Sequence, residues 1–168
     1  MPDINKLRLE RLGISVPEAA TPIANYITTA KSGKQLFVSG QLPLVKNKLL
    51  ITGKVDTEVS IENARKAAEV CAINILAQAQ AVLGDLSKIK QVTKITVFVA
   101  TDPGFFDISK IANGASDLFI NVLGAAGKHT RSTVGVAVLP MDATVEVEAV
   151  LEIRNILPKA AYNKELNL

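Results

Sequence analysis

Residues 92–123 read VTKITVFVATDPGFFDISKIANGASDLFINVL, and they contain the two patterns on which the fold depends. Residues 92–100 are rich in β-branched side chains that alternate with polar ones, which predicts a strand. The turn-forming pair Pro103-Gly104 ends it. Apolar side chains then recur every three or four positions from Ile108 to Leu123, which predicts a helix closed by Gly124.

Three short strands are predicted upstream of this unit. Residues 25–30 and 35–39 are rich in β-branched and apolar side chains, and the turn pair Ser32-Gly33 lies between them. This arrangement is typical of a β-hairpin. A third short strand is expected over 49–52, after a polar turn at 46–48.

A long helix is predicted between these strands and residue 92. Apolar or small side chains recur in steps of three and four from Ile61 to Val82. Ser60 is placed to cap the first turn, and Gly84 is placed to end the helix. Cys71 lies on the apolar face, so we expect it to pack in the core.

Two further strands are expected over 132–138 and 144–153, joined by a turn at 139–142. The order of elements predicts an α+β fold, with two helices packed on one face of a mostly antiparallel sheet. The strands carry apolar side chains on the other face as well. We therefore expect an oligomer to cover that face.

The length of 168 residues is that of one domain. We expect an N-terminal extension over 1–24, a single domain over 25–156 and a polar C-terminal tail over 157–168. No stretch reaches the 18 apolar residues of a membrane span, and the N-terminus lacks the apolar segment of a signal peptide. The expectation is a cytoplasmic protein without a membrane partner.

The composition excludes several kinds of chemistry. One Cys and one His cannot form a disulfide framework or supply the ligands of a Cys/His zinc site, so no metal is expected. A nucleophilic Ser-His or Cys-His pair would have to use His129. The net charge of +3 is spread along the chain and only 4% of residues are aromatic, so a nucleic-acid partner is not expected.

The richest stretch for chemistry is 128–140, KHTRSTVGVAVLP, followed by VEVE at 145–148. Arg131 stands at the entrance of a strand, where its guanidinium can bind a carboxylate through two parallel hydrogen bonds. If the following strand is its antiparallel partner, Glu146 comes near the same end of the sheet. The pattern alone favours two surface charges over a binding site, with His129 as a loop residue.

A resemblance narrows these alternatives. The segments LFVSGQLP (36–43), RSTVGV (131–136), LP (139–140) and VEVEA (145–149) occur in the order found in the Rid family, also called the YjgF family. The chain resembles that family from about Tyr26 to Ile153, in a longer branch. The resemblance implies a chorismate-mutase-like fold and a homotrimer with ligand sites between subunits.

The resemblance also implies a function. Active members hydrolyse reactive 2-imino or enamino acids to 2-oxo acids and ammonia, without a cofactor. By position, Arg131 matches the Arg that binds the substrate carboxylate, and Glu146 matches the Glu that positions water. The positions that match substrate-binding residues are Tyr26, Ser39, Gly40, Asn113 and Thr133.

Two other functions stay open at this point. One is a non-catalytic trimeric protein that binds small carboxylates for regulation. The other, ranked last, is an endoribonuclease, since the chain has no pair of histidines for acid–base chemistry.

Overall fold

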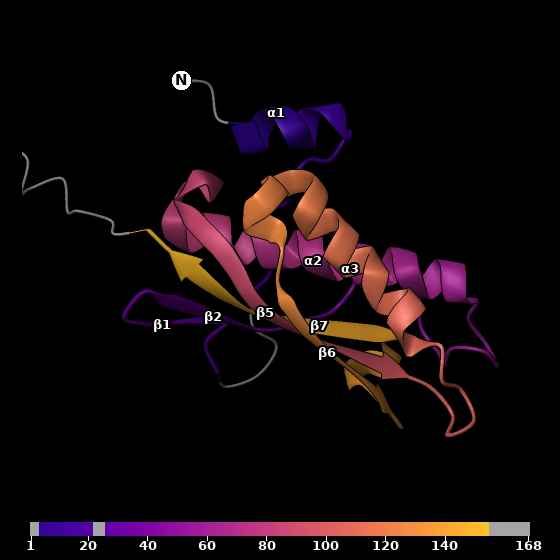
Figure 1. Ribbon diagram of the computed structural model, residues 1–168. Helices are drawn as coiled ribbons and strands as arrows, with labels where there is room; N and C mark the ends of the chain where they lie inside the picture. Colours follow the sequence, from indigo (N-terminus) through magenta and orange to yellow (C-terminus); the bar gives the residue numbers. More distant parts are fainter. Residues whose placement is uncertain (1–3, 22–25, 155–168) are drawn as a thin grey trace, which may run out of the picture.

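A five-stranded sheet and two long helices form the two main layers of the structure, a computed structural model that describes residues 4–21 and 26–154 (Figure 1). Along the sheet the strands follow the order β1-β2-β7-β5-β6. Their bounds are Thr29–Ser32 for β1, Gln35–Gln41 for β2, Val145–Ile153 for β7, Ile89–Ala100 for β5 and Thr130–Val136 for β6.

The two long helices begin and end where the capping residues predict. Helix α2 spans Ile61–Leu83, and the Ser60 hydroxyl accepts a hydrogen bond of 3.2 Å from the backbone N–H of Asn63. Gly84 follows in the left-handed conformation, with φ of 75°. Helix α3 spans Ile108–Leu123, as expected. Short 3-10 turns lie at Leu86–Lys88 (η1), Gly124–Gly127 (η2) and Pro140–Asp142 (η3).

The order of the strands differs from one expectation. All neighbouring strands pair antiparallel except β5 and β6, which are parallel. In the strand order, β5 lies between β6 and β7. Strand β7, which carries Glu146, is therefore not the partner of β6, which carries Arg131. The strand expected over 49–52 is also wrong: Leu44–Val45 (β3) and Lys48–Leu49 (β4) form a separate small hairpin.

The core lies between the sheet and α2 and α3. Cys71 is fully buried there, as predicted, and its Sγ lies 3.6 Å from the carbonyl oxygen of Val145. Burial raises the pKa of this thiol, and the nearby Glu146 carboxylate raises it further. The two helices approach closely at Gly114, where a Cβ atom would lie 2.0 Å from the carbonyl oxygen of Arg65.

A third helix, α1 (Ile4–Arg11), lies on the outer side of the helical layer (Figure 1). Leu9 is only 7% exposed and joins the core, and Arg8 donates a hydrogen bond of 3.5 Å to the carbonyl of Val122 near the end of α3. A cation at this end of a helix is favourable. The boundary expected near residue 24 and the tail over 157–168 fall outside the described residues, so the division of the chain stays a prediction.

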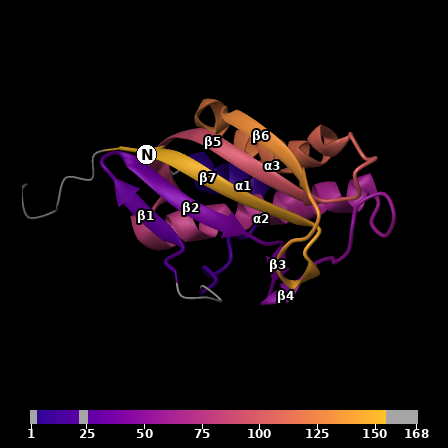
Figure 2. The ribbon, with the colours of Figure 1, turned by 90° about the horizontal axis from the view of Figure 1, so that it is seen from below.

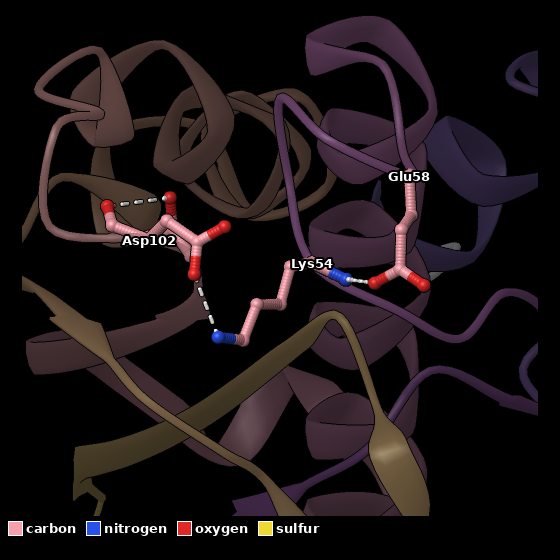
Figure 3. Close-up of polar contacts among 4 residues, drawn as sticks. Lys54, Glu58 and Asp102 are labelled. Carbon is pink, nitrogen blue, oxygen red and sulfur yellow. Dashed lines mark hydrogen bonds and ion pairs between the residues drawn. The ribbon is translucent and has the colours of Figure 1, made fainter.

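Two loops at one end of the sheet are joined by polar contacts (Figure 3). Lys54 Nζ lies 2.7 Å from Asp102 Oδ1, just beyond β5, and the Lys54 backbone N–H donates to Glu58 at 2.8 Å. The hydrogen bond to Asp102 raises the pKa of Lys54. These contacts fix the segment that leads into α2 against the segment that leads into α3.

The face of the sheet opposite the helices is seen in Figure 2, and no described element covers it. Phe37 and Val134 lie on this face and are each 44% exposed. Among residues 4–21 and 26–154, no helix combines the length and apolar character needed to cross a bilayer.

Candidate active site

Arg131 is held from helix α3. Its Nη1 donates two hydrogen bonds of 2.9 Å, to Oδ1 of Asn113 and to Oγ of Ser116. Asn113 and Ser116 lie three positions apart on α3, so both face the same strand. Nε and Nη2 of Arg131 make no hydrogen bond to a described residue, and no described carboxylate lies within ion-pair distance of the guanidinium. Three N–H donors on these two nitrogens therefore remain for an anion.

The register of β6 places Arg131 on the helical side of the sheet. Arg131 is opposite Ile95, and Thr133 is opposite Val97, on the parallel neighbour β5. Ile95 and Val97 are fully buried beneath the helices. Thr133 therefore shares the face of Arg131 and is partly buried.

Glu146 lies directly over Gly40 on the face of the sheet opposite the helices. The register between β2 and β7 shifts between Val38 and Gln41, which makes a bulge at Ser39 and Gly40. A Cβ atom at residue 40 would lie 1.7 Å from Oε1 of Glu146. Glycine therefore leaves the space that the carboxylate fills.

Buried amides hold this bulge. The side-chain amide nitrogen of Gln41 donates to the carbonyls of Ser39 at 3.1 Å and Gly40 at 3.3 Å. The side-chain amide nitrogen of Gln78, on α2, donates in turn to the side-chain oxygen of Gln41 at 3.4 Å. Gln41 and Gln78 are both almost fully buried. The backbone under Glu146 is thereby fixed from the core side.

Glu146 faces a cavity of about 210 Å³ that Tyr26, Gly40, Pro140 and Met141 also line. Its carboxylate is partly buried and accepts no hydrogen bond from the described residues. Burial raises the pKa of Glu146, and the neighbouring Glu148 raises it further. An unpaired carboxylate with a raised pKa next to a cavity is a candidate general base.

Ser39 lies beside this group rather than in it. It lines a neighbouring cavity of about 360 Å³ together with Glu148 and Phe37. Its hydroxyl is buried and has no partner among the described residues.

The predicted residues thus form two groups, and one chain does not bring them together. Arg131 is opposite Ile95 on β5, whereas Glu146 is opposite Phe98 on the same strand. Side chains three positions apart on a strand point to opposite faces. The first group contains Asn113, Arg131 and Thr133, and the second contains Tyr26, Gly40 and Glu146, with Ser39 beside it.

A larger cavity, of about 600 Å³, lies between α1 and the end of α2, and neither Arg131 nor Glu146 lines it. Sequence reasoning also missed two residues of the Arg131 group. Ser116 binds Arg131 directly, and His129, which lies in a loop as expected, is the next partner of Ser116. The spacing of Ser116 three positions after Asn113 was the available signal.

In the described part of the chain, no cluster of three or more His, Cys, Asp or Glu side chains is arranged to hold a metal ion.

Residues 6–153 match the profile of the family described as “YjgF/chorismate mutase-like, putative endoribonuclease”. The chain belongs to this family. The predicted chorismate-mutase-like α+β fold is therefore confirmed, as is the resemblance to the YjgF family.

The chain is 47% identical to Protein TCP17 of Trypanosoma cruzi over 150 residues, which cover 88% of this chain and 92% of that protein. It is 30% identical over 141 residues to a protein of Dermatophagoides farinae named 2-iminobutanoate/2-iminopropanoate deaminase, covering 83% and 94% of the two chains. A crystal structure from Agrobacterium tumefaciens, of a protein described as having unknown function, superposes with a TM-score of 0.85. That protein is 47% identical and the match covers 90% of this chain and 94% of that one.

Proposed function

We propose that the protein hydrolyses reactive 2-imino acids, and their enamine tautomers, to 2-oxo acids and ammonia. The observation that carries the proposal is Arg131, a guanidinium held by uncharged groups, whose Nε and Nη2 keep three N–H donors free. Such a group binds a carboxylate in a fixed orientation. The deaminase from Dermatophagoides farinae, at 30% identity, supports the choice of substrate class.

We further propose that the working site lies between two copies of the chain in a homotrimer. A substrate of a few carbon atoms cannot touch Arg131 and Glu146 of the same chain, because the sheet separates them. A second copy that packs against the open face would bring its Arg131 group toward Glu146 of the first. The exposed Phe37 and Val134 give this face the apolar surface that such an interface buries.

The chemistry needs two charges and one water. Arg131 binds the substrate carboxylate, and Glu146 accepts a proton as water attacks the carbon of the protonated imine. The product of this step is a neutral carbinolamine. The proton then passes from Glu146 to the nitrogen, the C–N bond breaks to release ammonia, and loss of the hydroxyl proton leaves the 2-oxo acid. No redox step occurs, so the balance requires no cofactor.

A trapping assay tests this activity. An amino-acid oxidase generates the imine, semicarbazide traps it, and the protein is expected to slow the appearance of the semicarbazone. Arg131→Ala and Glu146→Gln should abolish the effect. Glu152→Gln is the matched control, because Glu152 lies on the same face of β7 but pairs with Lys90 at 2.8 Å. Unchanged trapping with the wild-type protein would overturn the proposal.

Mixing two inactive variants tests the shared site. Arg131→Ala and Glu146→Gln are unfolded together and refolded as a mixture. Each cleft takes its Arg131 from one chain and its Glu146 from another, so about one quarter of the clefts are intact after random assembly. The mixture should recover about one quarter of wild-type activity, and each variant refolded alone should recover none. No recovery in the mixture would place both residues in one chain.

A binding protein without catalysis is the competing outcome. It predicts that 2-oxo acids raise the melting temperature of the wild-type protein but not of Arg131→Ala, while semicarbazone formation is unaffected. Saturation of a site at about 100 times its Kd stabilises the protein by about 2.7 kcal/mol, which a thermal melt detects readily.

A further inference from the structure

Both ring nitrogens of His129 have hydrogen-bond partners. Nδ1 lies 2.6 Å from the carbonyl oxygen of Gly127, and Nε2 lies 3.0 Å from Oγ of Ser116. The ring also makes a T-shaped contact with Phe119, with 6.0 Å between ring centroids. The side chain is partly buried between α3 and the start of β6.

The chemistry of these partners assigns every proton. A carbonyl oxygen only accepts, so Nδ1 carries the proton of the neutral ring and Nε2 accepts. The hydroxyl of Ser116 then donates its single proton to Nε2. Since a guanidinium only donates, the oxygen of Ser116 accepts from Nη1 of Arg131 at 2.9 Å. The resulting chain runs from Gly127 through His129 and Ser116 to Arg131.

We infer that His129 is a positioning residue that acts on Arg131 through Ser116; the inference rests on the proposed role of Arg131 in binding a carboxylate. A serine hydroxyl rotates freely, and its proton can point toward a neighbouring donor as easily as away from it. By taking that proton, His129 turns the lone pairs of the oxygen toward Nη1. The guanidinium then presents its other donors in one orientation.

The local backbone is built to allow this contact. A Cβ atom at Gly127 would lie 2.1 Å from the carbonyl oxygen of Phe119, so glycine lets η2 pack directly on α3. That packing brings the carbonyl of Gly127 within reach of the His129 ring. Asn113 and Ser116 then approach Arg131 from one face of α3.

Kinetics separate this role from a structural one. His129→Phe keeps an aromatic ring beside Phe119 and removes both nitrogens, whereas His129→Gln restores an acceptor for Ser116. A hydrogen bond to a charged group contributes enough that its loss should raise KM about tenfold. We expect kcat to change little, because the carboxylate is bound alike in the ground state and the transition state.

A double-mutant cycle and a matched control sharpen the test. Ser116→Ala breaks the same chain, so His129→Phe combined with Ser116→Ala should again cost about tenfold rather than about a hundredfold. Lys128→Ala, in which only the exposed neighbour of His129 changes, should behave as wild type. Independent losses that multiply in the double variant, or a His129→Gln variant as poor as His129→Phe, would overturn the inference.

A measurement without substrate distinguishes failure of this inference from failure of the proposed function. Because the chain has one histidine, the nitrogen spectrum of the untagged, ¹⁵N-labelled protein contains one imidazole. At mildly alkaline pH we expect the Nδ1–H tautomer, and an Nε2 resonance that moves in Ser116→Ala. An Nε2–H tautomer, or an Nε2 resonance unaffected by Ser116→Ala, would refute the chain of hydrogen bonds whether or not the protein hydrolyses imines.

Discussion

Replacing Gly40 by alanine should remove activity while leaving the fold intact. The new Cβ atom would lie 1.7 Å from Oε1 of Glu146, 2.6 Å from its Cδ and 3.0 Å from its Cγ. Ordinary contacts begin near 3.4 Å, so the carboxylate has to move by about 1.7 Å. A catalytic group displaced by about 1 Å costs on the order of a hundredfold in rate, so kcat/KM should fall at least about a hundredfold.

The cost in stability should be small, because the atoms that collide belong to the end of a flexible side chain beside a cavity. The free energy of unfolding in urea should change by less than about 1 kcal/mol. Gly104→Ala is the matched control: a Cβ atom there meets nothing within 4 Å, so both activity and stability should stay at wild-type levels. Wild-type kcat/KM in Gly40→Ala would show that the position of the Glu146 carboxylate does not matter. A large loss of stability would show that Gly40 serves the fold.

Three further predictions concern stability. Glu146→Gln should stabilise the protein near neutral pH. Folding raises the pKa of Glu146 above its ordinary 4.5, so the free energy of unfolding of the wild-type protein falls as pH rises from 4.5 through the folded-state pKa. Urea unfolding of both proteins at about pH 7 and about pH 4 should show a gain that disappears at the lower pH. Gly114→Ala should cost about 1–3 kcal/mol or more in the same assay, because the Cβ atom meets the backbone of Arg65. Ser60→Ala should cost about 1 kcal/mol through loss of the cap of α2, and an unchanged urea midpoint would contradict that role.

Local patterns predicted the helices well because their ends have local chemical causes. Ser60 caps α2 through a side-chain oxygen, and Gly84 ends it in a conformation that other residues rarely adopt. The strand order has no such local cause. The insertion of β5 between β6 and β7 depends on how the second helix crosses back over the sheet, which no strand pattern records. For this reason the expected pairing of the Arg131 and Glu146 strands was wrong.

For the candidate site, too, the residues could be predicted from the sequence, whereas their placement in the fold could not. The residue pattern already made Arg131 and Glu146 candidates, the family resemblance added Gly40 and the three roles, and those roles stay predictions. Their placement on two faces follows from register, because three positions separate Ile95 from Phe98 on β5. The role of His129 could not be predicted, since its contact with Ser116, 13 positions earlier on α3, forms only in the folded chain.

The two charges of the candidate site are kept unpaired, and this indicates the kind of ligand that fits them. Arg131 is bound by an amide and a hydroxyl, and a carboxylate in their place would compete with an acidic ligand. Glu146 faces no described cation, so its charge is also unmatched. A small ligand that satisfies both must carry a carboxylate at one end and a cation at the other. A protonated 2-imino acid has this distribution on adjacent carbon atoms, whereas a 2-oxo acid has lost the cation. Under the proposed hydrolysis, the product should therefore bind less tightly than the substrate, which would favour its release.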